Sequence, residues 1–335
     1  MLHLEIAREL IDSGRPDAAA RLLRRRVPPV LRVERDFLMA EALRSQGFFA
    51  AGEALYRKVL RTGELWAESA AGLTSILRSL GRVKEARALW DRARGKVPEP
   101  DWLLEDALID RAAGKYPRAL GKLAALKPRD RAEEAFILWA SGGARRFHGD
   151  LEGSRRDFAR SLALAGDNEG KAYALFGLGG VLRILGRFAE AEKAYAEAGR
   201  RLAGSPDLFG RAYAHCGLAN VLRQRGRLDE AERHYRKSHL LYSKLGDLVD
   251  LAYVDWGLGQ VHVKRGELVE GERRLRLALK GFAAGGEHRG WAMSEKALAE
   301  VLHARGRTAQ AERLFDSAVR RSRAAGLHAH LEIFT

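Results

Sequence analysis

A ten-residue pattern that returns every forty residues decides the fold. Residues 186–195 read GRFAEAEKAY, and the pattern appears again as GRLDEAERHY at 226–235, GELVEGERRL at 266–275 and GRTAQAERLF at 306–315. Upstream, matching segments begin at residues 14, 47, 81, 114 and 149, with shorter spacings of 33 to 37 residues. A fixed period of this length indicates a repeat architecture. Nine repeats cover almost the whole chain.

Each repeat predicts two helices joined by a tight turn. Five residues after the turn glycine stands a small residue, and four residues later a large apolar one, as in Ala191 and Tyr195. These positions lie one turn apart on the same face of a helix, where the small residue lets a neighbouring helix approach closely. The glycine suits the left-handed conformation that ends the first helix, which other residues adopt only at a steric cost.

The pattern resembles tetratricopeptide repeats in three respects. These are the small and aromatic residues of the second helix, the Leu-Gly or Leu-Ala pairs before the turn, and the period. The resemblance covers about the full chain and implies an all-α fold, a right-handed α-α superhelical solenoid of about nine helix-turn-helix repeats. The forty-residue repeats resemble those of kinesin light chains, LGN-type scaffolds and MalT-type and Rap-type regulators.

Two arrays are expected within this solenoid. Repeats of about 34 residues occupy residues 1–130, and repeats of about 40 residues occupy 131–335, continuous with the first array. The pattern is weakest between residues 100 and 150, where Asp106 and Ser141 stand at the usual leucine position, and a kink or junction is expected near Lys127 and Pro128. No polar capping helix is evident, so we expect that the ends of the solenoid either fray or are covered by a partner or by another copy of the chain.

The composition indicates an ordered, basic protein. Hydrophobic residues make up 46% of the chain and prolines number only 8, so we expect order nearly throughout. The net charge of +15 favours an acidic partner, either a protein segment or nucleic acid. The alternative explanation is compositional, because 46 of the 59 basic residues are arginine in a chain rich in Ala, Gly and Leu.

The N-terminus lacks a signal-peptide pattern, and no segment approaches the ~20 apolar residues that a membrane-spanning helix needs. A single cysteine, Cys216, excludes an internal disulfide. These features predict a cytoplasmic protein that does not cross a membrane.

No segment predicts catalysis or a cofactor. Residues 165–172, AGDNEGKA, resemble the end of a phosphate-binding loop, but the first glycine and the magnesium-binding Ser or Thr are missing and no strand precedes them. The ten histidines show no metal-ligand spacing, and we expect no metal site. Cys216 is interpreted as a small packing residue. The sequence therefore predicts a protein that is not an enzyme.

The candidate site follows from the resemblance, which implies that first helices line a concave groove. Three positions before the turn glycine, six consecutive repeats carry arginine: Arg44, Arg78, Arg111, Arg146, Arg183 and Arg223. We call these six residues the arginine ladder. The helix dipole also favours a cation near a helix C-terminus, by ~0.3 to 1 kcal/mol, so part of the ladder has a structural explanation.

Aromatic and amide side chains share the predicted groove with the arginines. The candidates are Tyr173, Tyr213, Tyr253, Phe176, Trp256, Asn220 and Gln260, with Gly177 and Gly180 as a bare backbone patch between Tyr173 and Arg183. Aromatics at helical spacing are also typical of a core, which is the alternative for the tyrosines.

Three functions are compatible with this groove. The preferred one is a non-enzymatic scaffold or adaptor that binds an extended, acidic protein or peptide segment. The alternatives are RNA binding, with phosphates on the arginines and bases on the tyrosines, and a regulatory sensor module that acts on a separate effector.

Overall fold

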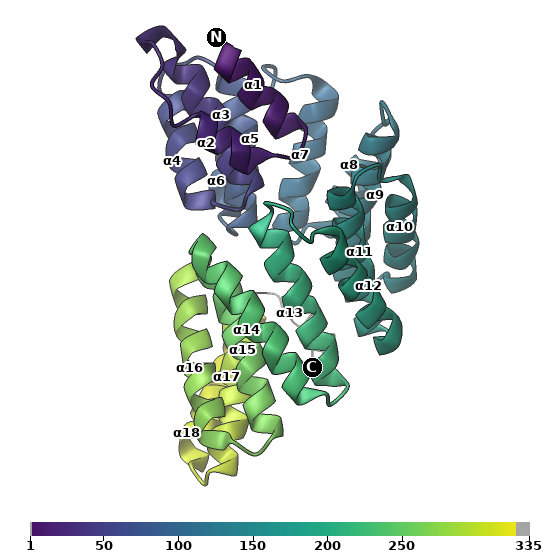
Figure 1. Cartoon of the computed structure of the whole chain (residues 1–335). Coiled ribbons are helices and arrows are strands. Elements are labelled where there is room, and N and C mark those ends of the chain that lie inside the picture. The colour runs from purple at the N-terminus through teal and green to yellow at the C-terminus, as the bar shows by residue number, and fades with distance from the viewer. Residues whose placement is uncertain (1, 326–335) are drawn as a thin grey trace. The chain divides into compact units, whose positions relative to one another are not determined.

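The computed structural model describes residues 2–325, and within that range it contains eighteen α-helices, one short 3-10 helix and no strand (Figure 1). This confirms the predicted all-α class. The helices group into two compact units, Met1–Gly166 with Gly204–Phe209 and Asp167–Ala203 with Gly210–Thr335.

The N-terminal unit contains ten helices. They are α1 (Leu2–Asp12), α2 (Pro16–Leu22), α3 (Arg32–Ser45), α4 (Phe49–Leu60), α5 (Trp66–Ser79), α6 (Val83–Asp91), α7 (Glu99–Ala112), α8 (Tyr116–Ala125), α9 (Arg131–His148) and α10 (Leu151–Leu164), with η1 (Pro29–Leu31) before α3.

The C-terminal unit contains the remaining eight helices, apart from the first two residues of α13. They are α11 (Asn168–Ile184), α12 (Phe188–Arg201), α13 (Leu208–Gln224), α14 (Leu228–Leu245), α15 (Leu248–Lys264), α16 (Leu268–Gly285), α17 (His288–Ala304) and α18 (Thr308–Ala324).

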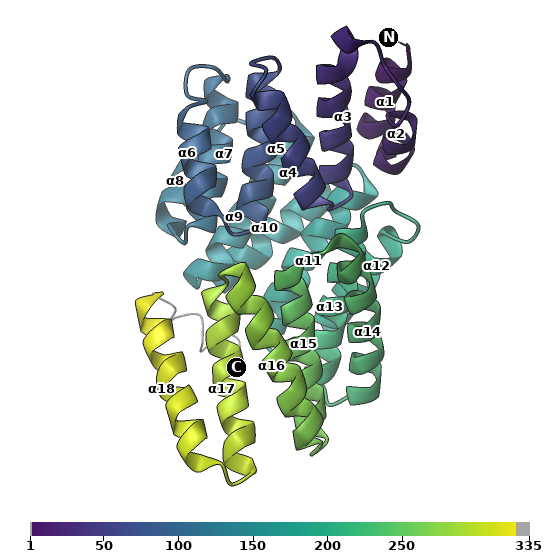
Figure 2. The ribbon, with the colours of Figure 1, turned by 90° about the vertical axis from the view of Figure 1, so that its left-hand side faces the viewer.

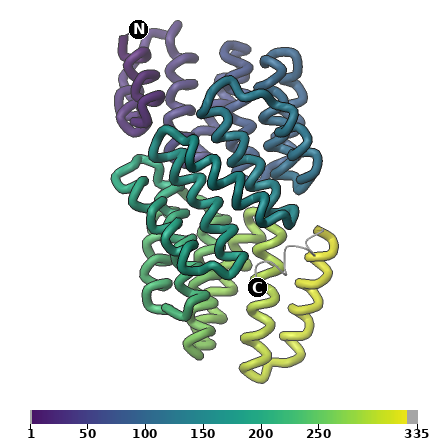
Figure 3. The backbone as a smooth tube through the Cα atoms, turned by 90° about the vertical axis from the view of Figure 1, so that its right-hand side faces the viewer, coloured from purple at the N-terminus to yellow at the C-terminus, as the bar shows by residue number. Residues whose placement is uncertain are grey.

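Each repeat is a pair of antiparallel helices, as the tube in Figure 3 shows. All nine predicted turn glycines have left-handed backbones, with φ between 73° and 99°. The N–H groups that follow the first helix bond back to its last carbonyls; for example, Arg227 N–H donates to Leu222 O at 2.9 Å. The helix-turn-helix prediction is confirmed for every repeat.

Packing within and between repeats follows the small and large positions of the second helix. All nine small residues are buried, and eight of the nine large residues are buried, whereas Phe315 in the last repeat is 50% exposed. The large residue also reaches the next repeat, because a Cβ added at Gly257 of α15 would overlap the ring of Tyr235 from α14. The ring of Tyr56 lies against Gly72 in the same way, and we call the space that such a glycine leaves for the ring a glycine slot. The glycines are therefore required by close helix approach.

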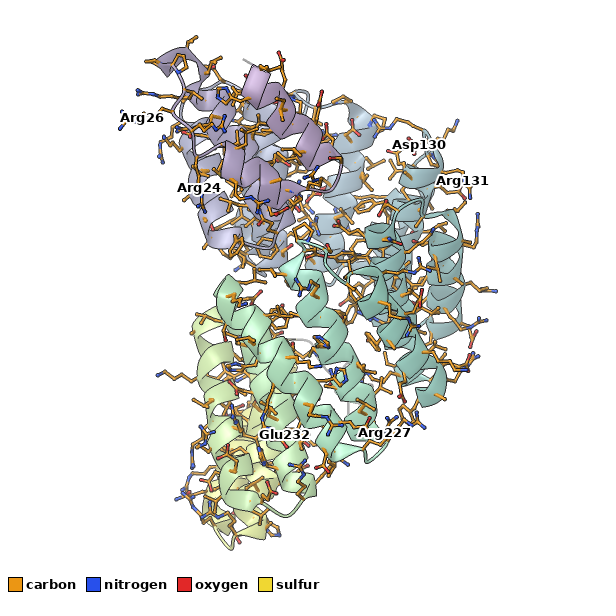
Figure 4. The ribbon with its side chains drawn as sticks, in the orientation of Figure 1. Arg24, Arg26, Asp130, Arg131, Arg227 and Glu232 are labelled. Carbon is orange, nitrogen blue, oxygen red and sulfur yellow. The ribbon has the colours of Figure 1, made fainter. Side chains whose placement is uncertain are left out.

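Ion pairs join the turn of one repeat to the second helix of the repeat before it, and we call them rungs. Glu192 accepts from Arg225 and Arg227, Glu232 from Arg265, Glu272 from Arg305 and Arg307, and Glu53 from Arg82. Figure 4 labels Arg227 and Glu232 at the start of α14. Many arginines thus have a structural role that composition alone does not reveal.

First helices lie side by side within each unit (Figure 2), since α1 contacts α3, α3 contacts α5, α5 contacts α7, α7 contacts α9 and α15 contacts α17. Neighbouring first helices therefore position the candidate site. The packing between residues 100 and 150 is intact, with α7 on α8 and α8 on α9. Buried Asp106, at the usual leucine position, is bonded to Arg87 and Lys122 instead of making apolar contacts.

Residues 127 and 128 lie between α8 and α9, inside the N-terminal unit. The junction expected there, the division at residue 130 and the continuity of the two arrays remain predictions. Residues 326–335 lie outside the described residues.

Candidate partner-binding face on the first helices

The candidate site is the set of residues three, six, ten and thirteen positions before each turn glycine, which we call the first-helix face. These positions recur on one side of a helix, and adjacent first helices bring them together across repeats. The six arginines of the ladder all lie on this face, but their environments differ.

In the first two repeats of the ladder, carboxylates neutralise the arginines. Arg44 forms an ion pair with Glu41 at 2.6 Å, and its Nε donates to the Tyr56 hydroxyl at 3.2 Å. The same hydroxyl donates to Glu41. Burial, followed by the charge of Glu41, raises the pKa of Tyr56, so the phenol stays protonated and acts as a hydrogen-bond donor. Arg78 pairs with Glu105 of α7 at 3.0 Å.

The next two arginines rest on aromatic rings. The guanidinium of Arg111 lies 4.6 Å from the centroid of the Trp139 ring, and that of Arg146 lies 4.6 Å from the Phe147 ring. Burial, with the neighbouring charges of Arg78 and Arg146, lowers the pKa of Arg111 to about 9. Arg111 is therefore close enough to both Arg78 and Arg146 to be repelled by their charges.

In the C-terminal unit, Arg223 is buried without a carboxylate partner among residues 2–325. Its Nε donates to the Tyr235 hydroxyl at 3.2 Å, and that hydroxyl donates to Asn220 Oδ1 at 2.8 Å. The guanidinium lies 5.0 Å from the Trp256 ring centroid. Arg183 of α11 donates to Gln224 at 3.4 Å.

Partly exposed polar groups share the first-helix face with Arg223. Asn220, Trp256 and Gln260 are each half-buried, and the indole Nε1–H of Trp256 is buried with no hydrogen-bond acceptor among the described residues. A buried donor without an acceptor is rare in folded proteins and marks a place where a bound partner can supply one.

The predicted tyrosines are half-buried and packed against other rings, so they combine the core and the surface alternatives. The ring centroids of Tyr173 and Phe176 lie 5.4 Å apart in an edge arrangement. The centroid distance is 4.9 Å between Tyr213 and Phe176, and 4.7 Å between Tyr253 and Phe282. Phe176 is 5% exposed and belongs to the core.

The bare backbone patch expected at Gly177 and Gly180 is wrong, because both glycines are buried. The reason is visible in the equivalent residues of later repeats. Gly217 and Gly257, which correspond to Gly177, face the rings of Tyr195 and Tyr235 from the preceding second helix. The space beside a glycine at this position is filled by the aromatic ring of the preceding repeat, so a ligand cannot enter it.

Other chemistry on this face is inert. Burial raises the pKa of the Cys216 thiol to about 12, so it remains protonated and unreactive. Asp167 caps α11 by accepting from Gly170 N at 2.7 Å, which already satisfies an N–H of the loop that resembled a phosphate site. Among residues 2–325, no three His, Cys, Asp or Glu side chains are arranged to hold a metal ion.

One histidine pair escaped the sequence analysis. Nδ1 of His215 on α13 and Nδ1 of His234 on α14 lie 3.0 Å apart. Burial, followed by the charge of His234, lowers the pKa of His215 to about 4. Two of the ten histidines whose spacing argued against a metal site, His328 and His330, lie outside the described residues.

Sequence reasoning also missed Tyr235, Tyr56 and Trp139. The two tyrosines were recognised only as packing residues, although a hydroxyl at that position reaches the first-helix face. Trp139 lies ten residues before Gly149, in the register of Trp256, so extending that register upstream finds it.

No helix in the described part of the chain is both long and apolar enough to cross a membrane.

Comparison with known proteins agrees with this architecture. A tetratricopeptide-repeat family model matches residues 3–25, 212–237 and 297–317, and a second one matches residues 141–206. No curated protein matches the sequence.

Two solved structures match this chain, and the first of them is similar in fold. A Rap protein complexed with competence and sporulation factor has a TM-score of 0.56 and 12% identity, covering 99% of this chain and 95% of that chain. BtubC (BKLC) from P. vanneervenii has a TM-score of 0.49 and 16% identity, covering 69% of this chain and 93% of that chain. At such identities the similarity concerns the fold alone.

Proposed function

Because the chain carries tetratricopeptide repeats, we propose that it is a non-enzymatic scaffold or adaptor whose first-helix face binds an extended, acidic segment of a partner protein. Interaction with proteins is the general role of such repeats. A Rap protein of similar fold is complexed with competence and sporulation factor, which is a precedent for binding.

One observation carries the acidic character of the segment: the buried guanidinium of Arg223 has no carboxylate among the described residues to neutralise it. A charge held in a low-dielectric site is weakly screened, so it attracts an anion more strongly than an exposed arginine does. Asn220 and Trp256, which are half-exposed beside it, supply donors for the backbone or side chains of the segment.

The test uses a labelled hexaglutamate peptide, a matched hexaglutamine peptide and a single-stranded RNA, each titrated by fluorescence anisotropy. The variant Arg183→Glu with Arg223→Glu is expected to bind hexaglutamate about a hundredfold more weakly, since a hydrogen bond to a charged group contributes ~1.5–3 kcal/mol. Hexaglutamine is expected to bind poorly to every variant.

The matched control is Arg24→Glu with Arg26→Glu, which makes the same change in charge at exposed arginines beyond α2 (Figure 4). Its affinity for hexaglutamate is expected to stay close to that of the unmodified chain. Equal losses in both double variants would mean that only net charge matters. RNA that binds more tightly than hexaglutamate, with a steep salt dependence, would favour the nucleic-acid alternative.

Cytoplasmic location, self-association through the ends and action as a sensor on a separate effector remain predictions from the sequence.

A further inference from the structure

Three guanidinium groups of the N-terminal unit lie together on the first-helix face. Arg78 of α5, Arg111 of α7 and Arg146 of α9 occupy the same register, and α7 contacts both of its neighbours. The charges of Arg78 and Arg146 both act on Arg111. Adjacent helices thus concentrate positive charge at one place.

Only part of this charge is neutralised. Glu105 pairs with Arg78, and the two side chains are 15% and 14% exposed. Within residues 2–325, no carboxylate lies within ion-pair distance of Arg111 or Arg146. Three guanidinium groups and one carboxylate leave an excess of two positive charges.

The side chains at the cluster are held in place before any ligand arrives. Arg111 lies along α9 between Trp139 and Gly143, and its Nη1 is 3.5 Å from Ala140 O. A Cβ at Gly143 would come within 2.9 Å of that nitrogen. Because the guanidinium is already immobilised by packing, binding an anion costs little further side-chain entropy.

Arg146 provides an independent observation that points to a ligand. Its Nε is buried and has no hydrogen-bond acceptor in the described part of the chain, while its guanidinium stacks on Phe147. Arg146 thus has a donor without an acceptor, and it lies beside Arg111, whose charged form is destabilised by burial. An anion with several oxygen atoms can satisfy both groups at once.

We propose that Arg78, Arg111 and Arg146 bind a phosphoryl group carried by a side chain of the partner segment. A phosphate monoester has close to two negative charges at neutral pH and three acceptor oxygens, which matches the excess charge, whereas a carboxylate supplies one charge. Planar guanidinium groups bind phosphate oxygens in a paired geometry. This inference rests on the proposed function only in that the phosphoryl group belongs to a partner protein.

The experiment compares three labelled peptides that share one glycine- and serine-rich sequence and differ at a single position, which is phosphoserine, glutamate or serine. Anisotropy titrations of the full chain are expected to give at least tenfold tighter binding for phosphoserine than for glutamate. Arg111→Gln and, separately, Arg146→Gln are expected to abolish that preference. Arg24→Gln, which removes one positive charge from an exposed position, is expected to retain it.

Melting of each variant followed by circular dichroism identifies any that fails to fold, and two separate substitutions in the cluster keep the test decisive. Equal affinity for the phosphoserine and glutamate peptides would overturn the proposal, as would a preference that survives both Arg111→Gln and Arg146→Gln. Binding of the single-stranded RNA that is lost in Arg111→Gln, without binding of the phosphopeptide, would assign the cluster to nucleic acid instead.

Inorganic phosphate is expected to compete with the phosphopeptide. A thermal-shift titration first gives the phosphate concentration at which half of the stabilisation is reached. Failure of phosphate at 50 times that concentration to displace the phosphopeptide would contradict the site. The hexaglutamate titration with Arg183→Glu and Arg223→Glu tests the proposed function separately, because those residues belong to the C-terminal unit.

Discussion

The same arrangement of three residues occurs in both units, but its net charge is neutral in one and positive in the other. In the N-terminal unit, Glu41, Arg44 and Tyr56 stand six before, three before and nine after the turn glycine, and in the C-terminal unit Asn220, Arg223 and Tyr235 hold these positions. The arginine Nε donates to the tyrosine hydroxyl at 3.2 Å in both.

The difference is one residue, Glu41 against Asn220. Glu41 accepts from both the tyrosine and the arginine, so the first arrangement is neutral overall. Among residues 2–325, Asn220 accepts a hydrogen bond only from the tyrosine hydroxyl, at 2.8 Å, and does not neutralise the charge of Arg223. The repeat therefore separates two tasks: the tyrosine fixes the geometry, and the position six before the turn decides whether the arginine attracts an anion.

The largest expected effect tests the part that the two arrangements share, the glycine slot under each tyrosine. Gly257→Ala places a Cβ inside the ring of Tyr235, and Gly72→Ala does the same at Tyr56. Each substitution is expected to lower the free energy of unfolding by about 1–3 kcal/mol, because overpacking forces the helices apart. The measurement is the midpoint of urea unfolding.

The matched control is Gly121→Ala on α8, where a Cβ would meet nothing within 4 Å. There the helix propensity of alanine is expected to stabilise the chain by up to ~1 kcal/mol. A Gly257→Ala chain as stable as the unmodified one would show that Tyr235 is not held by its glycine slot.

The second prediction exchanges the residue that differs. Asn220→Glu gives Arg223 the carboxylate that Arg44 has, and we expect it to weaken binding of the hexaglutamate peptide about tenfold, corresponding to ~1.4 kcal/mol. Glu41→Asn removes the neutralising group from Arg44 and is expected to strengthen binding by a smaller factor, since no tryptophan ring lies against Arg44 in the described part of the chain, whereas Trp256 lies against Arg223.

Asn220→Gln serves as the control, because it keeps the amide and changes only the length of the side chain. Anisotropy at two salt concentrations distinguishes a charge effect from a change in shape. Unchanged affinity in Asn220→Glu would refute the assignment of Arg223 to anion binding.

The third prediction concerns pH and arises in the C-terminal unit, from the His215–His234 pair. The pKa of His215 is about 4 in the folded chain, below its ordinary value of 6.5, because burial and the charge of His234 oppose protonation. Lys237 and Arg211 act in the same direction. A lowered histidine pKa contributes stability that is fully present above pH 6.5 and is lost as pH falls through about 4.

Urea unfolding measured between pH 7 and pH 4 is therefore expected to show a falling midpoint, and His215→Asn is expected to flatten this dependence. His303→Asn, an exposed histidine of α17, is the control and is expected to leave the pH profile unchanged. A profile that is equally steep in His215→Asn would assign the acid sensitivity to other groups.

The turns and helix pairs could be predicted from the sequence because they depend on local chemistry. Gly226 must adopt a left-handed backbone, and Ala231 must be small, whatever surrounds them. The register of the arginine ladder was equally readable, since it follows from counting residues back from each turn.

The environment of each ladder residue could not be predicted, because it depends on contacts between repeats. Glu105, which neutralises Arg78, belongs to a different helix, and no count along α5 reveals it. The burial of Gly177 was missed for a similar reason. Counting along a helix shows which residues share a face, but not which side chain a neighbouring repeat inserts there.

The rungs have a consequence for how such a chain can change in length. Glu192 meets Arg225, Glu232 meets Arg265 and Glu272 meets Arg305, and in each case the partners are 33 residues apart. Removing or duplicating one whole period keeps each carboxylate opposite a turn arginine. An insertion between the two partners of a rung leaves a carboxylate, buried in the case of Glu232 and Glu272, facing the wrong residue. Within the forty-residue repeats, the rungs thus act as a ruler that favours growth by whole repeats, whereas the shorter repeat of Glu53 and Arg82 keeps its rung at a spacing of 29 residues.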